Sequence, residues 1–152
     1  MKSNKWISLW IIPAAVFILA GCSLFKAPLV EPKTLEGSKA EEVLAYATPK
    51  ADNLIKGLVD GDYAVFSADF DATMKEGMNQ AAFDELRQIF ADKLGSYKSH
   101  EVSVVLEDEL YTTVAYKMIF EKDDAVVMRV VFDNNSPHPI TGLWFDSPEL
   151  RK

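Results

Sequence analysis

Acid–base catalysis is the reaction type that the side chains of this sequence could support. A small isomerase or dehydratase of this type needs a phenol close to an acid, and Tyr63 or Tyr116 could provide the phenol. Tyr116 is better explained as a core tyrosine, and the acids on the helical side as helix N-caps. The two histidines, His100 and His138, lie at the margins of expected strands, and we do not expect them to act as ligands or catalysts. We therefore assign no catalytic residue from the sequence.

Metal and cofactor chemistry has no matching motif in the sequence. There is no glycine-rich phosphate loop, and no Ser-His-Asp order in a recognisable context. Asp123-Asp124 with Asp133 lacks the spacing of a calcium-binding EF-hand, and acidic turns are usually only solvated. We expect no metal and no cofactor.

Methionine and aromatic side chains could line a soft apolar cavity, although they serve more often as core filling. The candidate cavity-lining residues are Tyr63, Phe66, Phe70, Tyr116, Met118, Met128 and Trp144. Such a cavity would suit a small apolar ligand.

The composition is that of a globular protein with an acidic balance. The 152 residues are 49% hydrophobic and 26% charged, and the formal net charge is −7. Phosphate backbones repel such a chain, and no cluster of Lys and Arg reverses the charge locally. We expect no nucleic-acid partner.

The N-terminal segment has the pattern of a secretory signal peptide. A short cationic stretch with Lys2 and Lys5 precedes an apolar run over 6–20, and small residues follow. Leu19-Ala20-Gly21-Cys22 resembles the lipobox of prokaryotic lipoproteins, in which the cysteine receives a diacylglycerol and becomes the new N-terminus. Cys22 is the only cysteine of the chain. The resemblance implies a lipid anchor, which holds firmly when two or more acyl chains are buried.

An uncleaved transmembrane anchor from Trp6 to about Phe25 is the alternative, because about 20 apolar residues can span a bilayer. Either anchor places the domain on the extracytoplasmic face of a cell membrane, since Lys2 and Lys5 stay inside. We divide the chain into a signal peptide (1–21), a lipidated cysteine and flexible tether (22–38) and one domain (39–152). Leu24, Phe25, Leu29 and Val30 could instead pack on that domain.

The first half of the domain has helical periodicity. Ser38-x-x-Glu41 reads as a capping box before an apolar series that runs to Gly61, with a kink or a break at Pro49. A short turn at 62–66 and another from Asp71 to Lys75 follow, each headed by an aspartate. A further helix begins at Asn79 and ends at Gly95.

The second half alternates with the period of strands. Four antiparallel strands are expected at about 97–106, 110–121, 125–133 and 139–146. Three-residue hairpin loops would set Met118 opposite Met128 and Tyr116 opposite Val130, on the face that the helices cover. Val102, Val104 and Leu106 would join this face.

The opposite face of the sheet is expected to carry an apolar patch with two cations side by side, Lys117 opposite Arg129. The candidate interface residues are Ala115, Lys117, Ile119, Val127, Arg129 and Val131. Exposed apolar patches often mark interfaces, so this face could form a homodimer or dock a partner. The C-terminal segment or the tether could equally cover it.

Helices followed by a curved antiparallel sheet make an α+β arrangement. The ordered motifs are Leu54-Ile55-Lys56-Gly57-Leu58, Gly61-Asp62-Tyr63, Phe66, Phe70-Asp71, Met74-Lys75, Phe83, Leu86, Gly95, Val114-Ala115-Tyr116, Phe120-Glu121 and Ile140-Thr141-Gly142-Leu143. Over roughly 40–146 the chain resembles an uncharacterised prokaryotic family of the superfamily built like nuclear transport factor 2 and ketosteroid isomerase. The resemblance implies a cone of three helices and a curled sheet around a pocket, in often exported proteins without an established activity. No base–donor pair of the isomerase can be carried over.

We therefore interpret the chain as a lipid-anchored, extracytoplasmic binding or dimerisation module for a small apolar ligand or an envelope protein. The alternatives are a small isomerase or dehydratase using Tyr63 or Tyr116 with an acid, and a structural envelope protein. A filled or dry cone favours a module, whereas converging ionisable groups favour an enzyme.

Lipidation predicts that Cys22→Ser blocks processing, because the acyl acceptor is lost. We expect the longer precursor to accumulate in mass spectrometry of membrane fractions. Unchanged mass and unchanged membrane retention would exclude lipidation at this residue.

Overall fold

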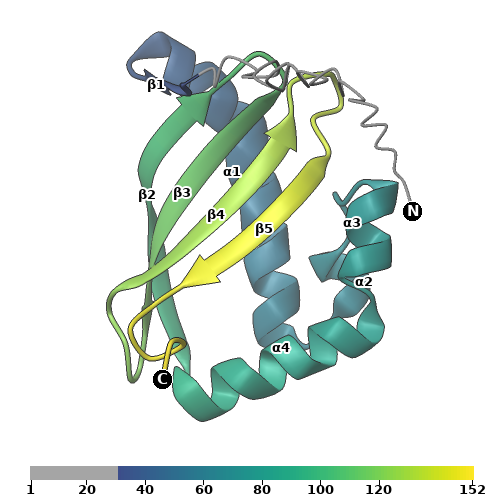
Figure 1. Cartoon of the computed structure of the whole chain (residues 1–152), viewed down its shortest axis with the longest axis vertical. Helices are drawn as coiled ribbons and strands as arrows, with labels where there is room; N and C mark the ends of the chain where they lie inside the picture. Colours follow the sequence, from purple (N-terminus) through teal and green to yellow (C-terminus); the bar gives the residue numbers. More distant parts are fainter. Residues whose placement is uncertain (1–30) are drawn as a thin grey trace, which may run out of the picture.

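The computed structural model describes residues 31–152, which form an α+β fold in which helices precede most of an open antiparallel sheet (Figure 1). The signal peptide, Cys22 and the apolar tether residues 24, 25, 29 and 30 lie outside the described residues. The elements are β1 (Lys33–Leu35), α1 (Ser38–Asp60), α2 (Tyr63–Phe66), α3 (Ala72–Gly77), α4 (Gln80–Lys93), β2 (Tyr97–Glu107), β3 (Tyr111–Phe120), β4 (Val126–Asp133) and β5 (Ile140–Asp146).

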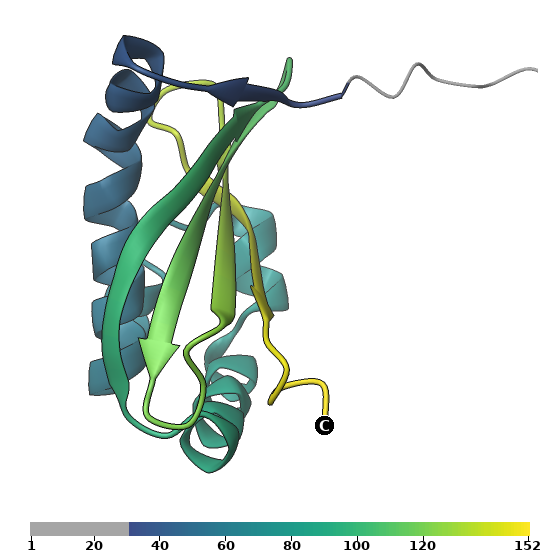
Figure 2. The same cartoon turned by 90° about the vertical axis from the view of Figure 1, so that its left-hand side faces the viewer.

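The sheet has the strand order β1-β2-β3-β4-β5, and every neighbouring pair is antiparallel. The helices cover one face: α1 runs along the strands, α2 and α3 lie at one side, and α4 crosses one end (Figures 1 and 2). Helix α1 therefore covers the middle of the inner face of the sheet.

The helix boundaries follow from local capping. The side chains of Asp62, Asp71 and Asn79 accept hydrogen bonds from backbone N–H groups in the first turns of α2, α3 and α4. Gly61 ends α1 in the left-handed conformation, as expected from the sequence. The expected capping box is absent, because Gly37, and not Ser38, occupies the N-cap without a side-chain hydrogen bond.

The tether contributes a strand that the sequence did not indicate. β1 pairs with the C-terminal end of β2, with Leu35 opposite Val105, and both side chains are buried. The sheet therefore has five strands, and the expectation of four was wrong. A stretch of three paired residues is too short to show a period of two, so pattern reading missed it.

The pairing of β3 with β4 differs from the expected register by two residues. Met118 lies opposite Val126, and Tyr116 lies opposite Met128. The connection over 121–125 is longer than three residues, and Phe120 N donates to the Asp123 carbonyl within it at 2.9 Å. Since the shift is even, the same side chains still face the helices.

Two register shifts in β2, between Tyr97 and Ser99 and between Val102 and Val104, change which of its side chains face inward. Val104 pairs with Ala115 on the outer face, which contradicts the expected inward position. Leu106 is turned outward in the same way, because it pairs with Thr113. Beyond the second shift the inner face of β2 instead presents Val105 and Glu107, whereas His100, before it, keeps the inward side that the expected alternation implies.

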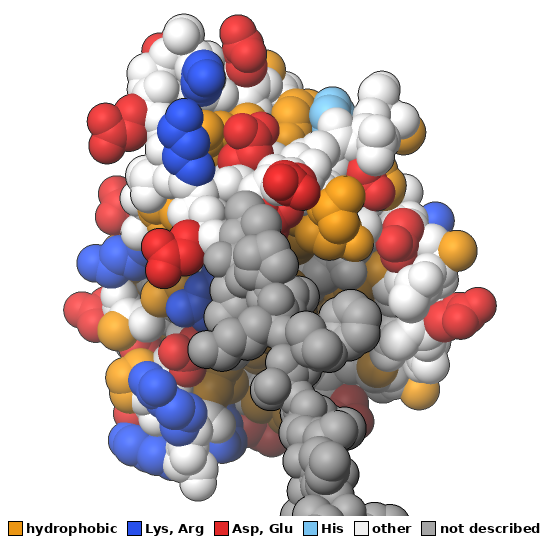
Figure 3. Space-filling view, turned by 45° about the horizontal axis from the view of Figure 1, so that its top comes forward, with side chains coloured by type: hydrophobic (Ala, Val, Ile, Leu, Met, Phe, Trp, Pro, Cys, Tyr) orange, Lys and Arg blue, Asp and Glu red, His pale blue; other side chains and the backbone are white. Residues whose placement is uncertain are grey.

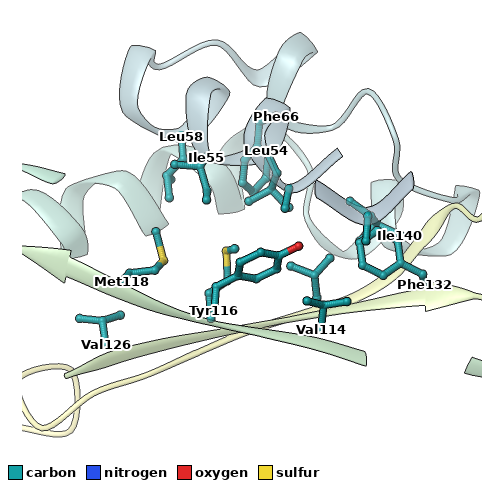
Figure 4. Close-up of a cluster of buried hydrophobic side chains, with 14 of the residues drawn as sticks. Leu54, Ile55, Leu58, Phe66, Val114, Tyr116, Met118, Val126, Phe132 and Ile140 are labelled. Carbon is teal, nitrogen blue, oxygen red and sulfur yellow. The ribbon is translucent and has the colours of Figure 1, made fainter. Parts of the chain in front are cut away.

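The middle of the molecule is a filled core (Figure 4). Tyr116 lies at its centre with no exposed surface, between the sheet and the α1 residues Leu54 and Ile55. Among the described residues the Tyr116 hydroxyl is the buried side-chain atom without a hydrogen-bond partner. A buried hydroxyl without a partner costs about 1–3 kcal/mol of stability. Burial, and secondarily the charge of Asp52, raise the pKa of Tyr116.

Tyr116→Phe should therefore raise the free energy of unfolding, by about 1 kcal/mol, because it removes a desolvated hydroxyl. The raised pKa adds a second signature. Above pH of about 10 the phenol ionises in the unfolded but not in the folded chain, so the wild type loses stability as the pH rises further. Urea titrations at increasing pH should therefore show a smaller loss of unfolding free energy above pH of about 10 in the variant than in the wild type.

Tyr111→Phe is the matched control, since Tyr111 is 41% exposed and its hydroxyl reaches water. It should leave stability nearly unchanged at neutral pH. A loss of stability in Tyr116→Phe beyond that of the control would show that the Tyr116 hydroxyl has a partner.

Candidate functional site: an apolar cleft beside α4

A cleft of about 300 Å³ opens between the C-terminal end of α1, the second half of α4 and the end of β3. Its lining is mostly apolar, with one cation and one phenol. The lining residues are Ile55, Leu58, Val59, Arg87, Phe90, Ala91, Gly95, Ser96, Tyr97, Met118 and Phe120. This volume is at the lower limit of pockets that hold small organic ligands.

The walls are fixed by packing between elements far apart in the sequence. Phe90 of α4 packs edge-to-face on Phe120 of β3, with ring centroids 5.6 Å apart. Tyr97 packs on the same Phe120 ring at 5.7 Å. Gly95, in the left-handed conformation, ends α4 and turns the chain into β2. The cleft is therefore pre-formed by rigid aromatic contacts.

Arg87 is held at the cleft by its inner nitrogen. Its Nε donates to the Leu58 carbonyl at 3.2 Å, and its guanidinium carbon lies 5.9 Å from the centre of the Phe83 ring. Gly61 leaves room for this group, because a Cβ there would lie 2.7 Å from the guanidinium carbon. Arg87 makes no salt bridge with any described residue. Its outer nitrogens are available to an anionic group.

A chain of hydrogen bonds connects the cleft to α1. The Tyr97 hydroxyl lies 2.7 Å from His100 Nδ1, and His100 Nε2 lies 3.2 Å from the Asp52 carboxylate. In a regular strand, residues three apart point to opposite faces, so the first bulge of β2 is what brings Tyr97 and His100 together. With Nε2–H donating to Asp52, Nδ1 accepts a hydrogen bond from the Tyr97 hydroxyl when the ring is neutral.

This chain orients the Tyr97 phenol without activating it. Burial, and secondarily the Asp52 charge, raise the pKa of Tyr97. A phenol that exchanges protons at neutral pH needs the opposite shift. Tyr97 is therefore a fixed, neutral hydrogen-bonding group at the wall of the cleft.

Of the cavity residues expected from the sequence, Met118 lines this cleft. Phe66, Phe70, Tyr116 and Met128 are buried in the core. Tyr63 packs on Phe66 and Phe83, and its hydroxyl donates to the Met78 carbonyl at 2.9 Å. These side chains fill the interior instead of surrounding a cavity.

Trp144 does not lie inside the fold, contrary to expectation. It is 56% exposed, pairs with Arg129, and covers Gly142 on the outer face of the sheet. A Cβ at Gly142 would lie 2.4 Å from the Trp144 ring. Ile140 and Trp144 are four residues apart, so a regular strand would place both side chains on the same face. The register of β5 against β4 shifts between Val131 and Phe132, which puts the buried Ile140 and the exposed Trp144 on opposite faces.

Sequence reasoning missed the side chains that make the cleft polar. Pattern reading placed His100 at a strand margin and singled out neither Asp52 nor Arg87. Their proximity arises from long-range packing and from a strand bulge, neither of which leaves a local signal in a single sequence.

The expected interface residues share the outer face of the sheet. Ala115 is buried, Ile119, Val127 and Val131 are partly exposed, and the two cations are exposed. The observed register places Lys117 opposite Glu101 and Val127, and not opposite Arg129, so the expected like-charge pair was wrong. The C-terminal residues pack beside α4 instead, where Lys93 Nζ donates to the Leu150 carbonyl at 3.1 Å. The homodimer stays a prediction.

Within residues 31–152, no group of three His, Cys, Asp or Glu side chains is arranged to hold a metal ion. The same part of the chain contains no helix long and apolar enough to cross a bilayer.

Neither the curated proteins nor the solved structures contain a match to this chain. A protein family does match over residues 51–137, from the middle of α1 to the turn after β4. The matched part includes Asp52 and all residues that line the cleft, Arg87, Tyr97 and Met118 among them. The chain belongs to the family described as "Protein of unknown function (DUF3887)".

Proposed function

We propose that this protein is a lipid-anchored, extracytoplasmic module that binds a small ligand with an apolar body and an acidic head group. The anchor is the diacylglycerol on Cys22, and the binding site is the cleft beside α4. We assign the fold to the cone of the nuclear transport factor 2 superfamily, with helices packed on one face of a curled sheet.

The single observation that carries the proposal is that the fold is filled at its centre and hollow at this end. Tyr116, Met118, Met128 and Phe66 leave no room in the middle of the sheet. The cleft beyond them retains about 300 Å³ with largely apolar walls. An apolar ligand gains about 25 cal/mol for each Å² of surface that such walls remove from water.

Arg87 supplies the polar recognition, because the Tyr97 hydroxyl already donates to His100 Nδ1 and has no proton left for a carboxylate. The guanidinium offers planar, charge-assisted hydrogen bonds that match a carboxylate. The chain as a whole is acidic, with a net charge of −7, so this cation is a local exception to a field that repels anions. A short fatty acid has the chemistry that the Arg87 guanidinium and the apolar walls select.

Binding is favoured over catalysis. Acid–base chemistry needs a group whose pKa lies near the working pH. The two phenols nearest the cleft and the core, Tyr97 and Tyr116, both have raised pKa values. Asp52, the acid of the hydrogen-bond chain, lies outside the cleft lining with a half-exposed side chain.

Ala91→Trp tests the cleft, because Ala91 is exposed on α4 and a large ring there fills the space. The readout is the methyl NMR signal of Met118 in the full-length chain in nanodiscs, titrated with octanoate. In the wild type this signal should shift and saturate, while Met74, distant from the cleft on α3, stays unchanged. Ala91→Trp should abolish the Met118 shift, and Arg87→Gln should weaken binding about tenfold.

Ala81→Trp is the matched control: it makes the same substitution on the same helix, away from the cleft. Octanoate partitions into the lipid equally in all samples, so differences between variants report on the protein. Equal octanoate responses in Ala91→Trp and Ala81→Trp, or equal shifts of Met118 and Met74, would contradict binding in the cleft.

A further inference from the structure

A second cleft, of about 440 Å³, opens at the opposite end of the sheet. Thr112, at the start of β3, lines it, whereas Phe120, at the end of the same strand, lines the cleft beside α4. Its lining residues are Leu35, Lys39, Glu42, Val43, Tyr46, Glu107, Thr112, Asn134 and His138. Acidic side chains lie around this end of the molecule, with hydrophobic ones among them (Figure 3).

One wall of this cleft is an aromatic stack. The rings of Tyr46 and His138 lie parallel, with centroids 4.0 Å apart, and Phe132 meets Tyr46 edge-on at 5.7 Å. The pKa of Tyr46 is raised above its usual value, chiefly by burial. A hydrogen bond with Thr112 lowers this pKa in part, and the charge of Glu107 raises it further. Tyr46 is therefore a neutral phenol close to the Glu107 carboxylate.

The turn that carries His138 is held in place by a lysine of α1. Lys50 of α1 donates to the carbonyls of Pro137 at 2.6 Å and of His138 at 2.9 Å, and it lies 3.5 Å from Asp69. His138 Nδ1 lies 3.0 Å from the Asp133 carbonyl, which can only accept, so Nδ1 carries a proton. The other ring nitrogen, Nε2, has no partner among the described residues and is an acceptor when the ring is neutral.

The floor of the cleft is a set of satisfied polar groups. Thr112, which is 1% exposed, donates to Asn134 Oδ1 at 2.7 Å, and Asn134 Nδ2 donates to the Asp108 carbonyl at 3.0 Å. These bonds leave the amide and the hydroxyl no freedom to turn. The site is therefore rigid before any ligand arrives.

Two carboxylates on this rigid frame form no ion pair within residues 31–152, although Lys33 of β1 lies opposite Glu107 in the sheet. Glu42 comes from α1 and Glu107 from β2, where the second bulge turns it inward. Neither forms an ion pair or a side-chain hydrogen bond with any residue in 31–152. Lys39 lines the same cleft, so the charged lining sums to one excess negative charge.

We infer that this cleft is a second binding site, which takes a small organic cation that carries a primary ammonium group. The ammonium has three donors and no acceptor, and the cleft offers it two carboxylates and the Nε2 acceptor of His138. The face or edge of the Tyr46 and His138 rings contacts its carbon skeleton. The inference does not depend on the proposed function, because the two clefts share no residue.

Calorimetry with 1,5-diaminopentane tests this assignment on the full-length chain in nanodiscs made of phosphatidylcholine alone, which carries no net charge. 1,5-Pentanediol is the neutral probe of the same length. We expect saturable binding of the diamine to one site and none of the diol. Glu42→Gln combined with Glu107→Gln should weaken diamine binding at least about tenfold, because each removes a charge-assisted hydrogen bond.

The matched control is Glu76→Gln combined with Glu85→Gln, which removes the same charge from exposed positions on α3 and α4. It should leave the affinity unchanged. Lys39→Gln should tighten binding, a gain that misfolding cannot produce. Absence of saturable diamine binding, equal binding of the diol, or equal weakening in the control variant would each overturn the assignment.

Discussion

The packing of α1 along the inner face of the sheet is the contact on which the rest of this structure depends. Ala47 and Ala51, in the middle of the helix, have no exposed surface and allow the helix backbone to approach the strands closely. The sheet curves along this helix (Figure 2), so the contact is tight in the middle. The two clefts open toward its ends, beside Val43 at one end and Leu58 at the other. A closed centre with two open ends follows from one helix on a curved surface.

This arrangement separates stability from binding. The large buried side chains, including Phe66, Phe132 and Met128, contribute the apolar area that holds the fold together. The polar groups that can recognise a ligand lie at the ends, where water still reaches them. The exception is the Tyr116 hydroxyl, which is polar and lies at the dry centre.

Much of the fold could be predicted from the sequence, because it is encoded locally. Asp62, Asp71 and Asn79 marked helix starts, Gly61 and Gly95 marked helix ends, and the alternation of Val, Tyr and Phe marked the strands from 97 onward. The expected β3–β4 register was wrong by two residues, and a shift of two leaves the same side chains on the buried face. What escaped was set by tertiary contact: β1 pairs for only three residues, and the bulges of β2 have no signature in its sequence. Tyr97 shares a face with His100, and Glu107 faces inward, only because of those bulges. The polar groups of both clefts were therefore the least predictable part.

The bulges of β2 have one more consequence, for the contacts between molecules. β1 covers β2 only at 105–107, so the edge of β2 from Tyr97 to Val104 is open to solvent. Both irregularities lie in that open stretch. A strand from another molecule needs an even row of donors and acceptors to extend a sheet, and a bulged edge interrupts that row. The distortions that shape the binding surfaces therefore also protect the protein against edge-to-edge aggregation.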